Sequence, residues 1–256
     1  MAGLDGKLAL VTGASRGYGR AIAERLGRDG AVVAVHYAVN DEAAKATVAS
    51  IETSGGQAFP VRAPLDGSLA RVATLFTELD KGLAKLGRGP TVDILVNNAA
   101  ISPRGTIADT SEATFDEVIA VCAKAPFFTV QAVLPRMPDG GRIINISSQT
   151  SLIAFPGVAA YSMAKGALDL LTMVAAKHLA PRNITVNAVL PGIADTDMNA
   201  SWLRDNAEAR ASASVFSAFK RIADVTDVAD IVGFLASSDA RWITGQLIDG
   251  GGGSGL

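Results

Sequence analysis

The sequence has one cysteine, two histidines and no cluster of like charges, and each shortage excludes a class of protein. Cys122 is the only cysteine among 256 residues, so no disulfide can form within the chain, which fits a reducing compartment. His36 and His178 have no acid or cysteine near them at ligand spacing, so we expect no metal. Basic residues are scattered and the net charge is −2, which argues against a nucleic-acid partner.

Long hydrophobic runs are also absent. The best candidate, GAVVAVHYAV (30–39), is too short to span a membrane and contains His36. The first residues, MAGLDGKLALVTG, lack the basic-then-apolar pattern of a signal peptide. We therefore expect a cytoplasmic protein with no membrane partner. Apolar residues make up 49% of the chain, enough for one large core, and we expect a single domain over residues 1–256.

Short β-branched segments alternate with longer helical patterns along most of the chain. Strands that are apolar on both sides and alternate with helices indicate an α/β fold, a parallel sheet covered by helices on both faces. We expect strands at 7–12, 31–36, 57–62, 93–97, 141–147, 184–190 and 246–249, and helices at 19–28, 41–54, 68–86, 112–137, 158–180 and 226–238.

The region 193–225 interrupts this alternation, because polar residues there surround isolated large apolar ones. Loops at the carboxyl ends of parallel strands build the ligand crevice of such folds, so we expect a small helical lid over a substrate. The alternative is a pair of surface helices that bury these apolar residues in the core or in a subunit contact. The apolar residues are Met198, Trp202, Leu203, Phe216 and Phe219.

A glycine-rich turn, TGASRGYGRAIA, directly follows the first expected strand and leads into a helix. Its glycines allow backbone N–H groups and a helix N-terminus to approach a pyrophosphate. The position between strand and helix favours a dinucleotide site over a purely structural turn.

The end of the second expected strand indicates which dinucleotide binds. Enzymes that use NAD usually place an acid there to hold the ribose 2′-hydroxyl, whereas this chain has His36 and Tyr37. Arg16, in the glycine loop, offers a guanidinium suited to a 2′-phosphate. The pattern favours NADP(H), the alternative for Arg16 being a solvated loop charge.

The segment YSMAK places Tyr161 and Lys165 one helical turn apart on the same face. A nearby ammonium favours the phenolate, so we expect Lys165 to lower the pKa of Tyr161 from its ordinary value near 10. Such a tyrosine can exchange a proton with a carbonyl oxygen during reduction or oxidation. Ser148, which ends the fifth expected strand, is placed to hydrogen-bond the same oxygen.

These motifs resemble the short-chain dehydrogenase/reductase family, in its single-domain branch, and the resemblance covers almost the whole chain. It is carried by TGASRGYG, the aspartate of PLDGS, NNAA, the serine of ISS, YSMAK, PGIADTDM and TGQLIDGGGG. It implies a Rossmann-type, doubly wound, seven-stranded parallel sheet, and a homotetramer or homodimer. The chain looks most similar to β-ketoacyl carrier-protein reductases and bacterial polyketide ketoreductases.

The resemblance also assigns roles to individual residues. Tyr161 would be the general acid/base, Lys165 would hold the nicotinamide ribose, and Ser148 would orient the substrate carbonyl. Asp66 would contact the adenine, Asn98 would lie along the adenosine ribose, and Ile193 and Thr196 would meet the carboxamide. The full expected cofactor set is Thr12, Gly13, Ser15, Arg16, Gly17, Tyr18, Gly19, His36, Asp66, Asn98, Tyr161, Lys165, Pro191, Gly192, Ile193 and Thr196.

Cys122 departs from the family pattern, because VCAKAPFF stands where VNAKAPFF is common. That asparagine completes a catalytic tetrad through its main-chain carbonyl. Pro126 has no N–H for the carbonyl of residue 122, so the backbone part of the tetrad can survive the substitution. Two further departures, Tyr18 and Ala100, lie in the glycine loop and in NNAA.

We therefore expect an NADPH-dependent ketoreductase that transfers hydride to a polyketide or β-ketoacyl ketone, with Tyr161 as the proton donor. Alcohol oxidation would use the same residues. The alternative is a cofactor-binding paralogue whose chemistry is weakened or repurposed because the tetrad position is Cys122.

Overall fold

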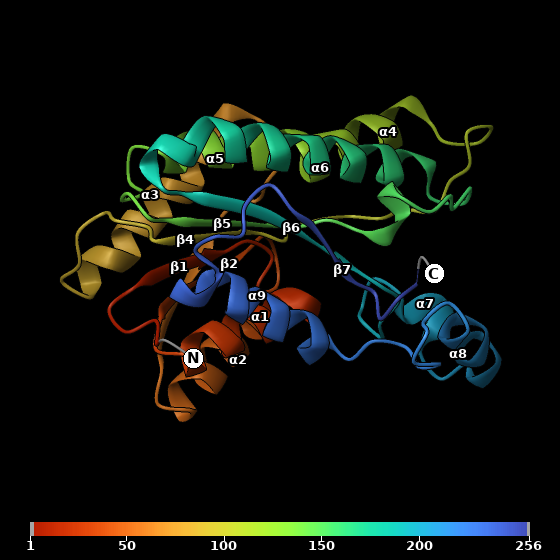
Figure 1. Ribbon diagram of the computed structural model, residues 1–256, viewed down its shortest axis with the longest axis horizontal. Coiled ribbons are helices and arrows are strands. Elements are labelled where there is room, and N and C mark those ends of the chain that lie inside the picture. The colour runs from red at the N-terminus through yellow and green to blue at the C-terminus, as the bar shows by residue number, and fades with distance from the viewer. Residues whose placement is uncertain (1–2, 255–256) are drawn as a thin grey trace.

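The computed structural model describes residues 3–254 and has one seven-stranded sheet at its centre (Figure 1). All neighbouring strands are parallel, in the order β3-β2-β1-β4-β5-β6-β7. From β1 the strands are added toward one edge of the sheet, and from β4 they are added toward the other edge. Doubly wound folds bind ligands at the point between β1 and β4 where this order reverses. The strands are β1 (Leu8–Val11), β2 (Val32–Tyr37), β3 (Gln57–Arg62), β4 (Ile94–Asn97), β5 (Arg142–Ile146), β6 (Thr185–Pro191) and β7 (Leu247–Gly250).

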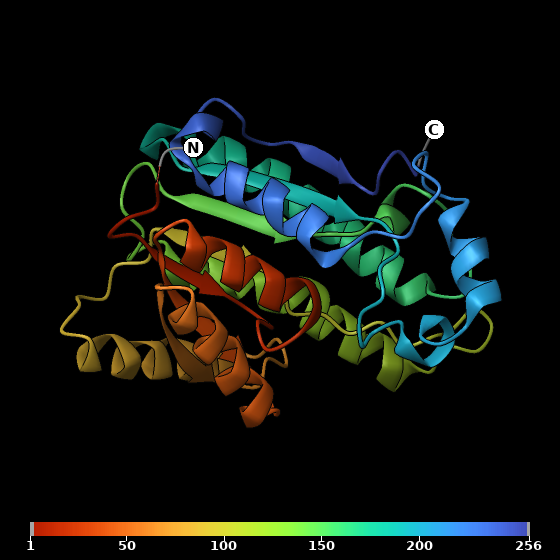
Figure 2. The same ribbon diagram turned by 90° about the horizontal axis from the view of Figure 1, so that it is seen from below.

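Helices cover both faces of the sheet, as Figures 1 and 2 show. The expected Rossmann-type α/β fold is confirmed. No helix within residues 3–254 has the length and apolarity to cross a membrane. One face carries α1 (Gly17–Arg28), α2 (Asp41–Thr53) and α9 (Val225–Ala236), and the other carries α3 (Leu69–Lys85), α4 (Glu112–Ile119), α5 (Ala125–Val133) and α6 (Ala159–Leu179).

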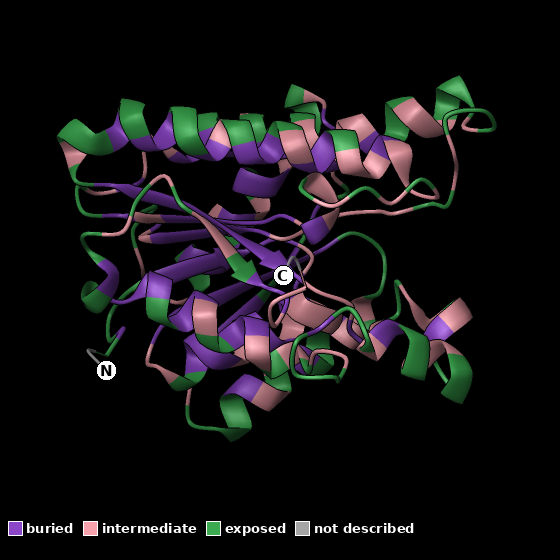
Figure 3. Cartoon of the chain, turned by 45° about the vertical axis from the view of Figure 1, so that its right-hand side comes forward, coloured by how far each residue is buried: buried purple, intermediate pink, exposed green. Residues whose placement is uncertain are grey.

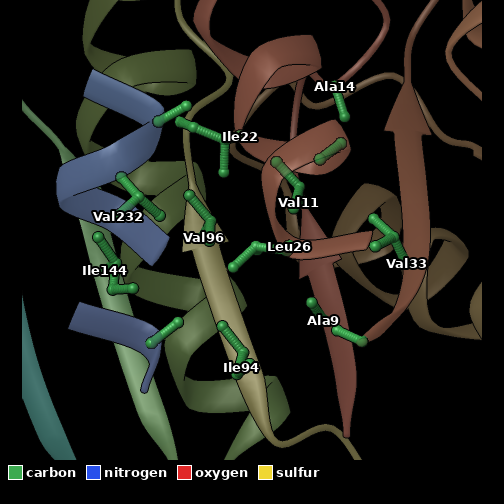
Figure 4. Packing of buried hydrophobic residues seen from close by; sticks show 14 of the residues in the cluster. Ala9, Val11, Ala14, Ile22, Leu26, Val33, Ile94, Val96, Ile144 and Val232 are labelled. Carbon is green, nitrogen blue, oxygen red and sulfur yellow. The ribbon is translucent and has the colours of Figure 1, made fainter. Parts of the chain in front are cut away.

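Successive strand residues point to opposite faces, so the four residues of β1 serve both cores. Ala9 and Val11 pack with α1 and α9, while Leu8 and Leu10 pack with α3 and α5. All four are 0% exposed. Figure 3 shows the inner strands of the sheet as buried, and Figure 4 shows the first of these cores with its branched aliphatic side chains interleaved.

Side chains at the helix starts explain several boundaries. Ser68 caps α3 by accepting from the Arg71 N–H, and Asp66 in turn accepts from the Ser68 N–H and hydroxyl. Asp224 and Asp227 form a reciprocal capping box at α9. Such caps satisfy backbone N–H groups that the first helical turn leaves unpaired.

The helix expected over 112–137 is interrupted. The structure has α4, then the π-helical turn η1 (Ala120–Lys124), then α5, which ends at Val133. Pro126 cannot donate a backbone hydrogen bond inside a helix, and the Ala125 N–H reaches back five residues to the Ala120 carbonyl. A π-turn at such a point is a frequent feature of functional sites.

Two short helices, α7 (Ala200–Leu203) and α8 (Ala207–Ser214), lie in the segment 193–225 between β6 and α9 (Figure 1). Leu203 is fully buried, whereas Met198, Phe216 and Phe219 are 45%, 49% and 74% exposed. The chain after β7 is docked on this segment, because the Gly252 carbonyl accepts from the Ala218 N–H at 2.9 Å.

Candidate active site

The glycine loop joins β1 to α1 at the carboxyl edge of the sheet. Gly13 and Gly17 have φ of +65° and +55°, a backbone region that favours glycine. At Gly19 a Cβ would lie 2.2 Å from the Gly13 carbonyl oxygen, so only glycine fits there. The loop therefore has the close-packed form that an N-terminal phosphate site requires.

His36 supports this loop from below instead of facing the cleft. Its Nδ1 accepts from the Gly13 N–H at 3.0 Å, and its Nε2 lies 2.7 Å from the Ala63 carbonyl. Because Nδ1 accepts, Nε2 carries the proton and donates to Ala63. The ring is 2% exposed, so the direct cofactor contact expected of His36 is not possible from this position. Burial lowers its pKa to about 4.

Thr12 and Asn98 connect the glycine loop to the end of β4. The Thr12 hydroxyl accepts from the Asn98 and Ala99 N–H groups at 2.9 and 3.0 Å. The Asn98 amide donates to the Thr12 and Gly13 carbonyls at 2.8 and 3.1 Å. Both side chains thus hold the loop in shape, although the resemblance had placed them along the cofactor.

Arg16 stands at the N-cap of α1 with its side chain 67% exposed. One guanidinium nitrogen lies 3.5 Å from Asp197, in the loop after β6. Asp197 also pairs with Arg204 at 3.1 Å, and Arg204 pairs with Asp195. A row of alternating charges therefore runs from the glycine loop to the segment 193–225.

The other expected cofactor residues surround the same loop. Tyr18 donates to the Gly192 carbonyl at 3.2 Å, and a Cβ at Gly17 would lie 3.5 Å from Thr196 Cγ2. Asp66 lies apart at the start of α3 with an exposed carboxylate. Ser15 is half-buried in the loop itself, Pro191 ends β6, and Ile193 begins the segment 193–225, where its carbonyl accepts from the Ala223 N–H.

Ser148, Tyr161 and Lys165 come together at the carboxyl end of β5 and the start of α6. Ser148 precedes a 3₁₀ turn and accepts from the Thr150 N–H, and its hydroxyl is hydrogen-bonded with Tyr161. The Lys165 ammonium lies 5.4 Å from the centre of the Tyr161 ring. The three residue types expected to act together are therefore neighbours.

Burial raises the pKa of Tyr161 above its ordinary range, and the hydrogen bond with Ser148 only partly opposes this. Lys165 is not among the groups that shift this pKa here, so the expected lowering by Lys165 stays a prediction. Lys165 is 2% exposed and donates to the Ile146 carbonyl at 2.6 Å, so its charge is turned toward the end of β5. The phenol is consequently a proton donor at neutral pH.

Cys122 lies in the π-turn η1, and its side chain reaches the loop after β4. The Ile101 N–H points at the sulfur at 3.4 Å, and the thiol donates to the Ile101 carbonyl at 3.3 Å. A thiol is a weak donor and acceptor, yet it makes both contacts. Burial raises the thiol pKa, so Cys122 is neutral.

Sequence reasoning missed two features of the site. Asp169, one turn beyond Lys165 on α6, is buried. Its four-residue spacing from Lys165 was the available signal. Asp197 opposite Arg16 had no signal, because 181 residues separate the partners. Among the described residues, no three His, Cys, Asp or Glu side chains converge to hold a metal.

Comparison with known proteins agrees with this geometry. Residues 13–254 match the family model described as enoyl-(acyl carrier protein) reductase. Versicolorin reductase 1 of Aspergillus parasiticus is 38% identical over 260 residues, covering 97% of each chain.

Solved structures are closer still. The promiscuous reductase LugOII, which catalyses keto-reduction at C1 during lugdunomycin biosynthesis, is 52% identical with a TM-score of 0.95 and 99% coverage of both chains. The angucycline C-6 ketoreductase LanV with bound NADP is 49% identical with a TM-score of 0.94, covering 99% of this chain and 97% of its own. LanV has also been solved with NADP and rabelomycin. The chain is an oxidoreductase that belongs to the short-chain dehydrogenase/reductase family.

Proposed function

We propose that this protein is an NADPH-dependent ketoreductase that reduces a ring ketone of the polyketide type. The proposal rests on one observation: a protonated Tyr161 lies beside Ser148 and Lys165. The glycine loop lies at the point where the order of the strands reverses. LugOII and LanV, both ketoreductases by description, are similar over nearly the whole chain.

The chain's own residues supply the proton and the orientation. NADPH, when bound, supplies hydride to the carbonyl carbon. Ser148 and Tyr161 hold the carbonyl oxygen, and the Tyr161 O–H transfers its proton to that oxygen as negative charge develops on it. The ketone thus gains one hydride and one proton and becomes an alcohol. The raised pKa of Tyr161 suits donation, which is the reductive direction.

The glycine loop fits a dinucleotide because a Cβ would obstruct its backbone at Gly19. Gly17 begins α1, so the helix N-terminus can receive the pyrophosphate. Arg16 would hold the 2′-phosphate in exchange for Asp197, its exposed partner. His36, Thr12 and Asn98 act by shaping the loop.

The segment 193–225 serves as the substrate lid. Phe216 of this segment lies 5.7 Å, centre to centre, from Phe155 in the loop before Tyr161. Trp202 in α7 lies under the Arg104 guanidinium at 5.3 Å. Both pairs join the lid to loops beside the catalytic residues, and their exposed aromatic faces suit a flat apolar ring. Rabelomycin bound to LanV is consistent with a ligand of that kind.

The enzyme works in the cytoplasm as a homo-oligomer, a tetramer or a dimer. Met163, Leu170 and Val174 form an exposed apolar stripe on α6, 61%, 58% and 59% exposed, and Phe127 on α5 is 50% exposed. Burial of such a stripe against a second copy is the ordinary way to remove it from water. Light scattering of wild-type and Leu170→Glu protein would measure the assembly state.

The test is NADPH oxidation with rabelomycin, with cyclic aromatic ketones and with β-keto esters. Tyr161→Phe keeps the ring but removes the proton donor, so we expect its kcat to fall at least a hundredfold while NADPH binding is retained. A wild-type protein that binds NADPH but reduces none of these ketones would refute the proposal and favour a non-catalytic paralogue.

A further inference from the structure

Tyr161, Lys165 and Asp169 follow one another at intervals of four along α6, so they lie on one face of the helix. Asp169 is 5% exposed, and its Oδ1 is buried with no hydrogen-bond partner in the described part of the chain. An unpaired buried carboxyl oxygen destabilises a fold. Packing alone therefore does not explain an aspartate at this position.

Three elements face the Asp169 carboxylate or its neighbour Lys165. On α6, Lys165 is itself 2% exposed, and burial lowers its pKa. From η1 comes Cys122, which is neutral because burial raises the thiol pKa. From the end of β5 and the turn after it come the hydroxyls of Ser147 and Ser151. Burial raises the pKa of the Asp169 carboxyl, while Ser147, Ser151 and Lys165 oppose this shift. Asp169 in turn raises the pKa of Lys165.

The two serines bracket Ser148, the residue that orients the substrate carbonyl. The Ser151 hydroxyl donates to the Ser148 carbonyl at 2.8 Å, and the Ser147 hydroxyl donates to the Lys165 carbonyl at 3.4 Å. The first contact closes the turn on itself, and the second joins the end of β5 to α6. Asp169 lies at the point where the turn and the helix meet.

We propose that Asp169 is a positioning residue, which keeps the buried Lys165 in its ammonium form and packs against Ser147 and Ser151 beside the turn that presents Ser148. The proposal rests on the reductase function proposed above. Asp169 touches neither substrate nor cofactor in this scheme and acts only through its neighbours.

Asp169→Asn tests the charge with little change of shape. We expect Lys165 to hold the nicotinamide ribose as an ammonium. Removal of the carboxylate lets this ammonium lose its proton, and with it that hold, at lower pH. We expect the alkaline limb of the pH profile of kcat/KM, where the rate falls as pH rises, to shift to lower pH by at least half a unit. Asp169→Glu should restore the limb at least in part. Asp139→Asn, the same change at an exposed ion pair with Arg182, should leave the limb in place.

Ser151→Ala removes the hydroxyl that closes the turn on Ser148, without altering charge. We expect kcat to fall several-fold while the alkaline limb stays where it is in wild type. A purely structural Asp169 would instead lower the melting temperature of Asp169→Asn and leave its pH profile unmoved. That result, in a folded variant, would overturn the proposal.

A titration of the wild-type protein provides a measurement that needs neither turnover nor a variant. NMR of ¹⁵N-lysine-labelled and ¹³C-aspartate-labelled protein follows the Lys165 Nζ and the Asp169 carboxyl over the same pH range. We expect the Lys165 signal to respond at the pH where Asp169 titrates. Independent titrations would overturn the proposal even if Asp169→Asn does not fold. Absence of ketone reduction alone would count against the reductase function and not against this coupling.

Discussion

The His36 ring makes the stability of the glycine loop depend on pH. Its folded-state pKa is about 4, against about 6.5 in an unfolded chain. Between these values the unfolded state binds a proton that the folded state does not. The contribution of the neutral, buried His36 ring to the free energy of unfolding is therefore complete above pH 6.5 and is lost as pH falls from 6.5 to 4. A difference of about 2.5 pH units corresponds to about 3 kcal/mol.

His36→Gln removes the titrating group and keeps one amide donor near Ala63. The measurement is urea unfolding of wild-type and variant protein at several pH values between 7.5 and 4. We expect wild type to lose about 3 kcal/mol more than the variant over this range. His178→Gln, on an exposed part of α6, is the matched control and should follow wild type.

Two parallel unfolding curves for wild type and His36→Gln would refute the reasoning. They would mean that the ring is hydrated or protonated in the folded state. A second readout follows from the bond between Nδ1 and the Gly13 N–H. Protonation breaks this bond, so NADPH affinity should weaken toward pH 4.5 in wild type by more than in the variant.

Two further predictions concern single side chains at the site. Cys122→Asn should change kcat/KM by less than tenfold and stabilise the fold by about 1 kcal/mol, because an amide makes stronger bonds to the Ile101 backbone. Cys122→Ala loses both bonds and should destabilise the fold by about 1–3 kcal/mol. Urea unfolding measures the stability of each variant, and NADPH turnover measures its activity. Turnover by the asparagine variant alone would contradict the view that the thiol suffices. Asp197→Asn should tighten NADPH binding about two- to fivefold, since an exposed pair with Arg16 contributes at most about 1 kcal/mol, and fluorescence titration should show NADH binding unchanged. An equal gain for both cofactors would mean that Asp197 does not compete for Arg16.

The sheet could be predicted from the sequence because most strands are apolar on both faces, and β1 and β2 are buried throughout. The catalytic triplet could be predicted because Tyr161 and Lys165 share one helix and Ser148 ends the preceding strand. Patterns that repeat within one element are readable without knowledge of the partners.

The parts that could not be predicted depend on contacts between distant segments. Burial raises the pKa of Tyr161, and Lys165 donates to the carbonyl of Ile146, which belongs to another element. We expected His36 to contact the cofactor, but its two ring nitrogens bond to the backbone of Gly13 and Ala63. The break at 120–124 was foreshadowed by Pro126, yet the sequence could not say whether a kink or a wider turn would form.

The π-turn η1 also works as a phase shift between two helices. Before it, Val118 packs in a small core against α6; after it, Val130 and Val133 pack in the large core beneath the sheet. One residue advances an α-helix by about 100°, so the wider turn sets the angle between the two buried faces. If 120–124 formed an ordinary α-helix with every residue kept, one of these faces would rotate by about 100° out of its core. Loss of one residue would remove the wide turn and keep both faces in place, because a π turn holds one residue more than an α turn. The wide turn therefore accommodates one extra residue without moving either face.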